Sequence, residues 1–200
     1  MAGCGGSPPA LPATPPPPAP AVAVAFAEDP RPLARFHSTR LSLSLPLPDG
    51  RGWQIDDHSR PELVATHPAT RSRVVVAVLR ADELVGRTQC ETLAHERGLV
   101  PSAQLQVLEQ EIGITQESFD TRTLVAVDPG GGPGQPLVGH VMAFGGFLRK
   151  CYVFDFSTEV DSAANEATLS SRLAYARARI LGGLRLEAFD TVTREAPKAP

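Results

Sequence analysis

The sequence predicts an α+β fold, an α/β sandwich in which an antiparallel or mixed sheet of six to eight strands is covered by helices on both faces. Three observations support this prediction. Most apolar residues fall in short runs with strand-like alternation, and only two stretches have a helical period. The run RVVVAVL at 73–79 is apolar at consecutive positions, as expected of a strand covered on both faces. The length of 200 residues is enough for one such domain with an appendage.

The first 32 residues are predicted to be a disordered, proline-rich spacer. Ten of the chain's 20 prolines lie there, and charged and aromatic side chains are almost absent. Such a segment buries too little apolar surface to offset the entropy lost on ordering it. We therefore expect the folded domain over residues 33–190 and a frayed polar tail over 191–200.

The domain is predicted to begin with four strands. Leucines at 41, 43, 45 and 47 alternate with serines and prolines at 42, 44, 46 and 48, which is the pattern of a half-buried strand with an exposed end. Pro48-Asp49-Gly50 is a turn sequence. Residues 51–56 around Trp53, 62–66 and 73–79 are predicted as the following strands. A lone tryptophan at this place most often closes the edge of a core.

Two helices and four further strands are predicted in the rest of the domain. A helical stripe between residues 82 and 98 carries Leu84, Cys90, Leu93 and Ala94. Strands are expected at 105–111, 121–127, 137–144 and 148–157, with Gly145-Gly146 as a turn or bulge between the last two. The terminal helix is expected from Asp161 or Ser162 to Gly182-Gly183, because Leu169, Leu173, Ala176, Ile180 and Leu184 share one face.

Composition excludes two classes of protein. The net charge is −3, the isoelectric point is about 5.9, and no block of five basic residues occurs, so nucleic acid is not an expected partner. No apolar run approaches the roughly 18 residues that a transmembrane helix requires. Residues 21–27, AVAVAFA, resemble the end of a signal peptide but are too short and lack a basic segment before them.

The opening MAGCGG resembles a bacterial lipoprotein lipobox. Ala2, Gly3 and Cys4 match its last three positions, and a long spacer follows. Because the basic and hydrophobic signal segment is absent before Met1, this reading requires a natural start further upstream. It predicts a lipid on Cys4 that attaches the protein to the membrane. Gly5 after the cysteine favours an outer-membrane lipoprotein that faces the periplasm or the exterior. The alternative is a chance cysteine in a disordered segment.

The two remaining cysteines form a candidate disulfide. Cys90 lies on the buried stripe of the middle helix, and Cys151 lies on the strand face opposite Tyr152, Phe154 and Phe156. A helix packed on that face would bring them together. In an oxidising envelope, a bridge closing roughly 60 residues would stabilise the fold by about 4 kcal/mol. The alternative is a pair of unrelated buried thiols.

No arrangement of residues predicts catalysis or a cofactor. His95-Glu96 resembles the start of a zinc-protease helix, but Leu99 stands where the second histidine belongs. The glycine-rich run 128–134 is not followed by Lys-Ser/Thr, so a hairpin loop is the better interpretation, and G-x-S-x-G is absent. His140 is interpreted as a structural histidine. Candidate metal donors, without a recognised spacing, are Asp56, Asp57, His58 and His67.

The order of these parts resembles the PsbP-like α/β sandwich. The shared features are the leading strand, turn and Gly-Trp of residues 41–53, the middle helix, the aromatic strand of 151–156, and the terminal helix that closes on 180–184. The resemblance covers residues 33–189, whereas the glycine-rich loop is not part of the pattern and no metal-binding histidines can be matched. It implies noncatalytic roles in binding or assembly and brings no active-site residues.

These observations favour a noncatalytic, lipid-anchored protein of the cell envelope that acts as a binding or assembly module. Its protein partner or ligand is not specified by the sequence. One alternative is a soluble, chaperone-like module of the same fold. The other is a metal-dependent envelope hydrolase that uses Asp56, His58 or His67.

Overall fold

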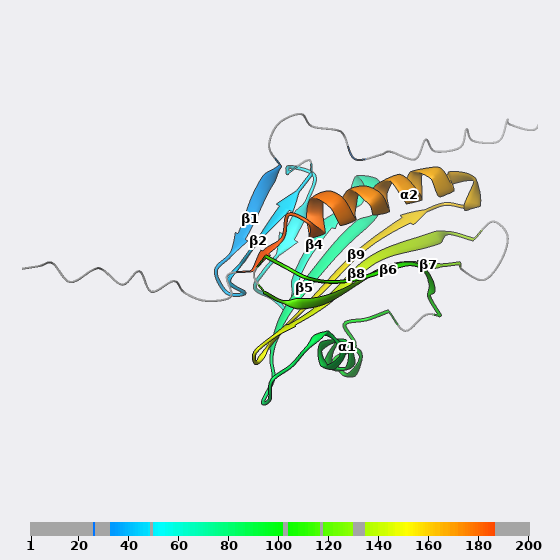
Figure 1. Cartoon of the computed structure of the whole chain (residues 1–200). Coiled ribbons are helices and arrows are strands. Elements are labelled where there is room, and N and C mark those ends of the chain that lie inside the picture. Colours follow the sequence, from blue (N-terminus) through cyan, green and yellow to red (C-terminus); the bar gives the residue numbers. More distant parts are fainter. Residues whose placement is uncertain are drawn as a thin grey trace, which may run out of the picture.

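The structure is a computed structural model, which describes Phe26 and residues 33–48, 50–101, 104–116, 118–129 and 135–186. Two antiparallel sheets and two main helices make up this part of the chain (Figure 1). The larger sheet contains β3 (Gln54–Asp56), β4 (Leu63–His67), β5 (Ser72–Arg80), β6 (Gln106–Ile114), β7 (Asp120–Asp128), β8 (Leu137–Phe147) and β9 (Lys150–Val160). Its strand order is β3-β4-β5-β9-β8-β7-β6.

The smaller sheet has the order β1-β2-β10 and was not predicted as a separate unit. It consists of β1 (Ala34–Ser38), β2 (Leu43–Leu47) and β10 (Arg185–Leu186). The alternating leucines were expected to form a half-buried strand, but every residue of β2 is buried. The reason is that both faces of β2 are covered. Leu43, Leu45 and Leu47 pack in the main core. On the other face, Ser44 accepts a hydrogen bond from the Arg35 guanidinium at 3.3 Å, and Pro46 lies against Gly183.

The helices lie on opposite faces of the larger sheet, which confirms the predicted sandwich (Figure 1). Helix α1 (Arg87–Glu96) is shorter than expected, and Leu84 lies outside it with 73% of its surface exposed. Helix α2 (Glu166–Tyr175) follows the 3₁₀ turn η2 (Ala163–Asn165) and continues as the π-helical segment η3 (Ala176–Leu181). A second 3₁₀ turn, η1 (Pro68–Thr70), joins β4 to β5. No helix in the described ranges is long and apolar enough to span a membrane.

Strand β9 supplies side chains to two separate cores, as its alternation predicted. Phe154 and Phe156 pack beneath α2, together with Leu169 and Ile180. Cys151 and Val153 pack beneath α1, together with Cys90. The central strands are therefore buried on both faces, and this accounts for the consecutive apolar residues of β5.

The glycine pair Gly145-Gly146 does not form a turn, which corrects the prediction. Strand β8 continues through both glycines, and the turn falls at Leu148 and Arg149. A β-carbon on Gly145 would lie 2.0 Å from Cε1 of Tyr152. A β-carbon on Gly146 would lie 2.6 Å from the backbone of residues 85 and 86. Close packing, and not a change of chain direction, therefore requires the two glycines.

Phe26 belongs to the core, which corrects the predicted spacer over residues 1–32. Its side chain is 5% exposed, and its ring lies 5.5 Å from that of Tyr175 and 6.2 Å from that of Trp53. Trp53 closes the core edge, as expected, and its Nε1 donates a hydrogen bond to the carbonyl of Pro48. An anchoring contact therefore lies several residues before the predicted domain boundary.

Candidate functional site

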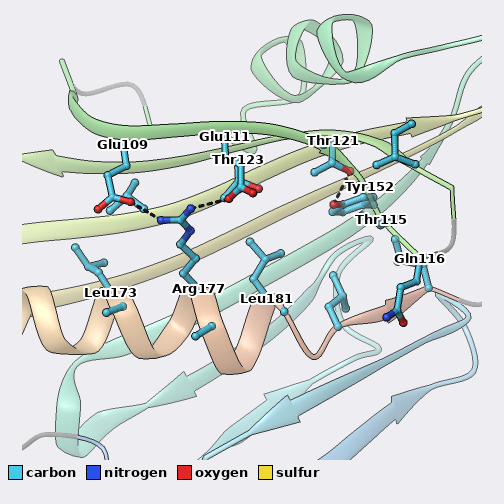
Figure 2. A pocket seen from close by; sticks show the side chains of 18 of the residues that line it. Glu109, Glu111, Thr115, Gln116, Thr121, Thr123, Tyr152, Leu173, Arg177 and Leu181 are labelled. Carbon is cyan, nitrogen blue, oxygen red and sulfur yellow. Dashed lines mark hydrogen bonds and ion pairs between the residues drawn. The ribbon is translucent and has the colours of Figure 1, made fainter.

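A cleft of about 760 Å³ lies between the terminal helix and the edge of the larger sheet (Figure 2). One wall is formed by α2 and η3, the other by β6 and β7, and β10 closes one end. Its lining includes Glu109, Glu111, Thr121, Thr123, Val125, Tyr152, Leu173, Ala174, Arg177, Leu181, Leu184 and Leu186. This volume falls within the range of sites that hold small ligands.

The cleft exists because the helix lies over one side of the sheet. Gly139 of β8 faces the helix, and a β-carbon there would lie 2.7 Å from Cδ1 of Leu173 and 2.9 Å from Cδ1 of Leu169. The missing side chain lets α2 settle on β8 and β9. Strands β6 and β7 are left without a covering helix on that face, and all nine residues of β6 are exposed.

The floor of the cleft is apolar and buried. Val125, Leu173 and Leu184 are each less than 9% exposed, and Tyr152 is 2% exposed. The Tyr152 hydroxyl shares a hydrogen bond of 3.0 Å with Oγ1 of Thr121, so its one polar atom has a partner (Figure 2). Phe119 supports the tyrosine ring edge-on at 5.3 Å. A surface of this kind accepts apolar groups.

Charged side chains bridge the mouth of the cleft. Arg177 extends from η3 toward β6, where its guanidinium forms ion pairs with Glu109 and Glu111 (Figure 2). The Nη2–Oε2 distance to Glu111 is 2.6 Å. The hydrogen bond to Glu111 raises the pKa of Arg177 above its ordinary value, with the charges of both glutamates adding to the effect. The guanidinium is therefore permanently charged.

The ion pairs of Arg177 with Glu109 and Glu111 are weak enough for a ligand to break. The side chain of Arg177 is 35% exposed, and those of Glu109 and Glu111 are 61% and 64% exposed. Ion pairs at such positions contribute only about 0 to 1 kcal/mol. A ligand can displace one of these contacts at small cost.

The predicted disulfide is present between Cys90 and Cys151, whose Cα atoms lie 5.4 Å apart. It fastens α1 to β9 within the core beneath α1. The cleft lies on the opposite face of the sheet, so the disulfide has no part in its lining. Cys4, the predicted lipid attachment site, lies outside the described residues, as do residues 130–134 of the glycine-rich run.

The structure does not gather the candidate metal donors into one site. Oδ1 of Asp56 accepts hydrogen bonds from the backbone of His58 and Ser59, and Asp57 is paired with Arg40 at 3.2 Å. The buried His67 has its Nδ1 at 2.8 Å from Thr70 Oγ1. Within the described ranges, no three His, Cys, Asp or Glu side chains are placed to hold a metal ion.

His140 is buried and paired, in agreement with its interpretation as a structural residue. Its Nδ1 lies 3.0 Å from Oδ1 of Asp155 on the neighbouring strand. His95 and Glu96 are exposed in the last turn of α1, in agreement with a solvated helix face.

The residues that shape the cleft are not predicted by the sequence. Arg177 is separated from Glu109 and Glu111 by 68 and 66 positions, so no local spacing connects them. The sequence of β6 does contain one relevant pattern, because apolar residues alternate there with two glutamates and no basic residue occurs. This pattern indicates an acidic strand but does not identify its partner, Arg177.

No protein-family model and no curated protein matches the chain, but solved structures do. The solution structure of a cyanobacterial PsbP, CyanoP from Synechocystis sp. PCC 6803, matches with a TM-score of 0.50 at 14% identity. The match covers 82% of this chain and 98% of CyanoP. The fold is PsbP-like. The resemblance inferred from the sequence is confirmed at the level of the fold.

A second match is a crystal structure from Bacteroides thetaiotaomicron VPI-5482, with a TM-score of 0.42 at 12% identity. It covers 76% of this chain and 47% of the other, so the chain spans about half the length of that protein. The described elements of the PsbP-like domain run from Ala34 to Leu186, and the cleft is formed by its terminal helix and its edge strand.

Proposed function

We propose that this chain is a noncatalytic binding module of the cell envelope, which takes an apolar group of its ligand into the cleft between α2-η3 and β6-β7. The observation that carries the proposal is the cleft itself. Its floor consists of buried apolar side chains, and its mouth carries the pairs between Arg177 and the two glutamates. An apolar body with a few polar groups at the rim is the usual chemistry of a ligand site.

The chemistry of the lining supports binding over catalysis. The ionisable groups of the lining already have partners. Glu109 and Glu111 pair with Arg177, Arg185 donates to the carbonyls of Gly182 and Leu184, and the Tyr152 hydroxyl shares a hydrogen bond with Thr121. A general acid or base needs a side chain that reaches the reacting group with a suitable pKa. The PsbP-like resemblance also implies binding or assembly and no active site.

The proposed location in the cell envelope is supported by the N-terminal sequence. A lipid on Cys4 would attach the module to the envelope, with Gly5 favouring the outer membrane. The proline-rich spacer would let the domain work away from the bilayer, since such a segment spans up to about 3.1 Å per residue. The disulfide is in keeping with an oxidising compartment.

A probe titration tests the cleft. The apolar fluorophore N-phenyl-1-naphthylamine is titrated into the full chain, and we expect saturable binding with an increase in emission. Ala174 lines the cleft and is exposed, so Ala174→Trp fills the space and is expected to weaken binding at least tenfold. The matched control is Ala167→Trp, on an exposed part of α2 outside the cleft lining. Equal binding by all three proteins would refute the cleft as the site.

Metabolic labelling tests the anchor. The gene is expressed with its natural upstream sequence in cells supplied with radiolabelled palmitate, beside a Cys4→Ser variant. We expect label and membrane fractionation for the first protein and neither for the second. An unlabelled, freely soluble wild-type protein would favour the chaperone-like alternative. Stoichiometric binding of zinc that His67→Ala abolishes would favour the hydrolase.

A further inference from the structure

Strand β6 ends the larger sheet and has an open outer edge. It pairs with β7 on one side, and no other strand of the described residues pairs with its free side. Its register with β7 shifts between Val107 and Glu109, after which pairing is regular from 109 to 114. An unpaired edge presents backbone donors and acceptors that can bind a further strand.

The two faces of β6 differ in chemistry. Glu109, Glu111 and Gly113 share the cleft face with Val125, Thr123 and Thr121, their partners on β7. Ile112 and Ile114 belong to the other face, because successive side chains of a strand alternate, although Ile114, the last residue of β6, also lines the end of the cleft. These isoleucines are 51% and 77% exposed. Edge strands are commonly protected from pairing by charged residues, especially lysine, by proline or by a bulge. Strand β6 has no lysine or proline, its two charged residues are the glutamates of the cleft face, and its register shift lies before the regular segment 109–114.

The cleft face of β6 has excess negative charge. Both glutamates pair with the guanidinium of Arg177, and both carboxylates remain more than half exposed. Arg185 also lines the cleft, but it donates hydrogen bonds to the carbonyls of Gly182 and Leu184. One negative charge is therefore left over in this cluster. A strand added beside β6 with basic residues on this face would complement it, because opposite charges on neighbouring strands attract.

We propose that β6 is a docking strand for an extended segment of a partner protein in which basic and apolar residues alternate. The backbone of the segment pairs with residues 109–114. Its basic side chains lie beside Glu109 and Glu111, and its apolar side chains cover Ile112 and Ile114. This surface adds to the cleft as a second binding element, since it uses the backbone edge of β6 and not the floor lined by Tyr152.

A second copy of the chain fits this edge less well. An antiparallel pair of β6 strands centred on Gln110 would place Glu109 of one copy opposite Glu111 of the other on the same face. Four carboxylates would then surround two Arg177 side chains. Like charges directly opposite each other on paired strands are destabilising. The charge pattern therefore selects a basic partner.

Peptide binding by the full chain tests the docking strand. The probe is a nine-residue peptide in which valines alternate with lysines, and its counterpart has glutamates in place of the lysines. We expect the lysine peptide to bind at least about tenfold more tightly by calorimetry. We also expect it to slow amide hydrogen exchange in residues 109–114. The variant Glu109→Lys/Glu111→Lys should reverse the preference between the two peptides.

A matched pair of variants distinguishes binding at the edge of β6 from nonspecific binding of the peptide elsewhere on the protein. Ile112→Lys places a charge on the apolar face of β6 and is expected to weaken lysine-peptide binding about tenfold. Ile55→Lys makes the same change on β3, the opposite edge of the sheet, and should leave binding unchanged. Equal binding of both peptides, protection from exchange outside β6, or dimerisation of the free protein through β6 would each overturn the proposal. Because Ala174→Trp leaves this edge intact, loss of probe binding in that variant does not affect this test.

Discussion

Gly145 determines where the aromatic ring in the cleft floor can lie. Its hydrogen faces Tyr152, whose ring occupies the space that a side chain at 145 would need. Gly113 on β6 has no atom within 4 Å of the corresponding position. A side chain added at residue 145 would therefore collide with its neighbours, whereas one added at residue 113 would not.

We predict that Gly145→Ala lowers the free energy of unfolding by about 1 to 3 kcal/mol, because the added methyl group overpacks the core. The displaced tyrosine also narrows the floor, so binding of the naphthylamine probe should weaken. Gly113→Ala is the control and should change the free energy by no more than about 0.5 kcal/mol. Urea unfolding measures both values, and equal values for the two variants would contradict the packing at Gly145.

Asp56 shows at the residue scale how a candidate metal donor is already used. A hydrogen bond from the Ser59 hydroxyl, with others from the backbone of Ser59 and His58, lowers the pKa of Asp56 from 3.8 to about 2. Because the folded-state pKa is lowered, the stabilisation is present above about pH 4. It is lost as the pH falls through about 2.

We predict that Ser59→Ala raises the pKa of Asp56 toward 3.8. The pH titration of the Asp56 carboxyl carbon by NMR measures this directly, with Ser171→Ala on the exposed face of α2 as the control. If Asp56 titrates at the same pH in wild type and Ser59→Ala, the hydroxyl does not hold this carboxylate.

At the scale of elements, one buried arginine joins the terminal helix to the sheet. Arg172 is 3% exposed, and its Nη1 donates to the carbonyl of Thr70 at 2.9 Å and to that of Glu159 at 3.1 Å. The same nitrogen donates to Oγ1 of Thr158 at 3.2 Å. Burial, with a smaller contribution from the charge of Arg71, lowers the pKa of Arg172 below its ordinary value. The helix position therefore depends on polar contacts as well as on its leucines.

We predict that Arg172→Ala destabilises the domain by about 3 kcal/mol, because buried carbonyl groups lose their donor. Arg179→Ala, at an exposed position of η3, should cost no more than about 0.5 kcal/mol. Chemical unfolding of the two variants gives the comparison. Similar stabilities would show that the hydrogen bonds of Arg172 are dispensable.

The disulfide links two elements that sequence periodicity placed correctly. It closes a separation of 61 positions, for which loop entropy gives a stabilisation of up to about 4 kcal/mol. We predict a loss of this order in Cys90→Ala/Cys151→Ala and no loss in Cys4→Ala. Probe binding should persist in the folded double variant, because α1 lies on the face away from the cleft. A double variant as stable as wild type would contradict a structural role for the bond.

How far the sequence predicts these elements depends on the range of the interactions that define them. Alternation in residues 151–156 predicts both faces of β9 because the signal is local. The burial of β2 between two partners is not visible locally, since β10 lies some 140 positions away in the chain. The same limit applies to Arg172, whose partners are in the β4–β5 turn and β9, and to the cleft, whose walls meet only after folding.

At the scale of the whole molecule, the two faces of the larger sheet differ in how completely a helix covers them. The disulfide holds α1 against one face, whereas α2 covers the other only partly and leaves the cleft and the edge of β6 open. The smaller sheet and Phe26 complete the core that lies beneath α2 and η3. A second, smaller apolar hollow lies at the β8–β9 turn, lined by Leu84, Phe147 and Leu148 with Arg149 and Lys150. An apolar ligand could bind in this hollow instead of the cleft, so an experiment must distinguish the two sites.

NMR mapping of the bound probe tests most directly whether the helix–strand cleft is the ligand site. N-phenyl-1-naphthylamine is titrated into isotope-labelled full-length protein while backbone amide shifts are followed. We predict that the largest changes fall on residues 121–125, Tyr152 and the cleft face of residues 173–181. Changes concentrated at Leu84 and Leu148, or beneath α1, would contradict the account.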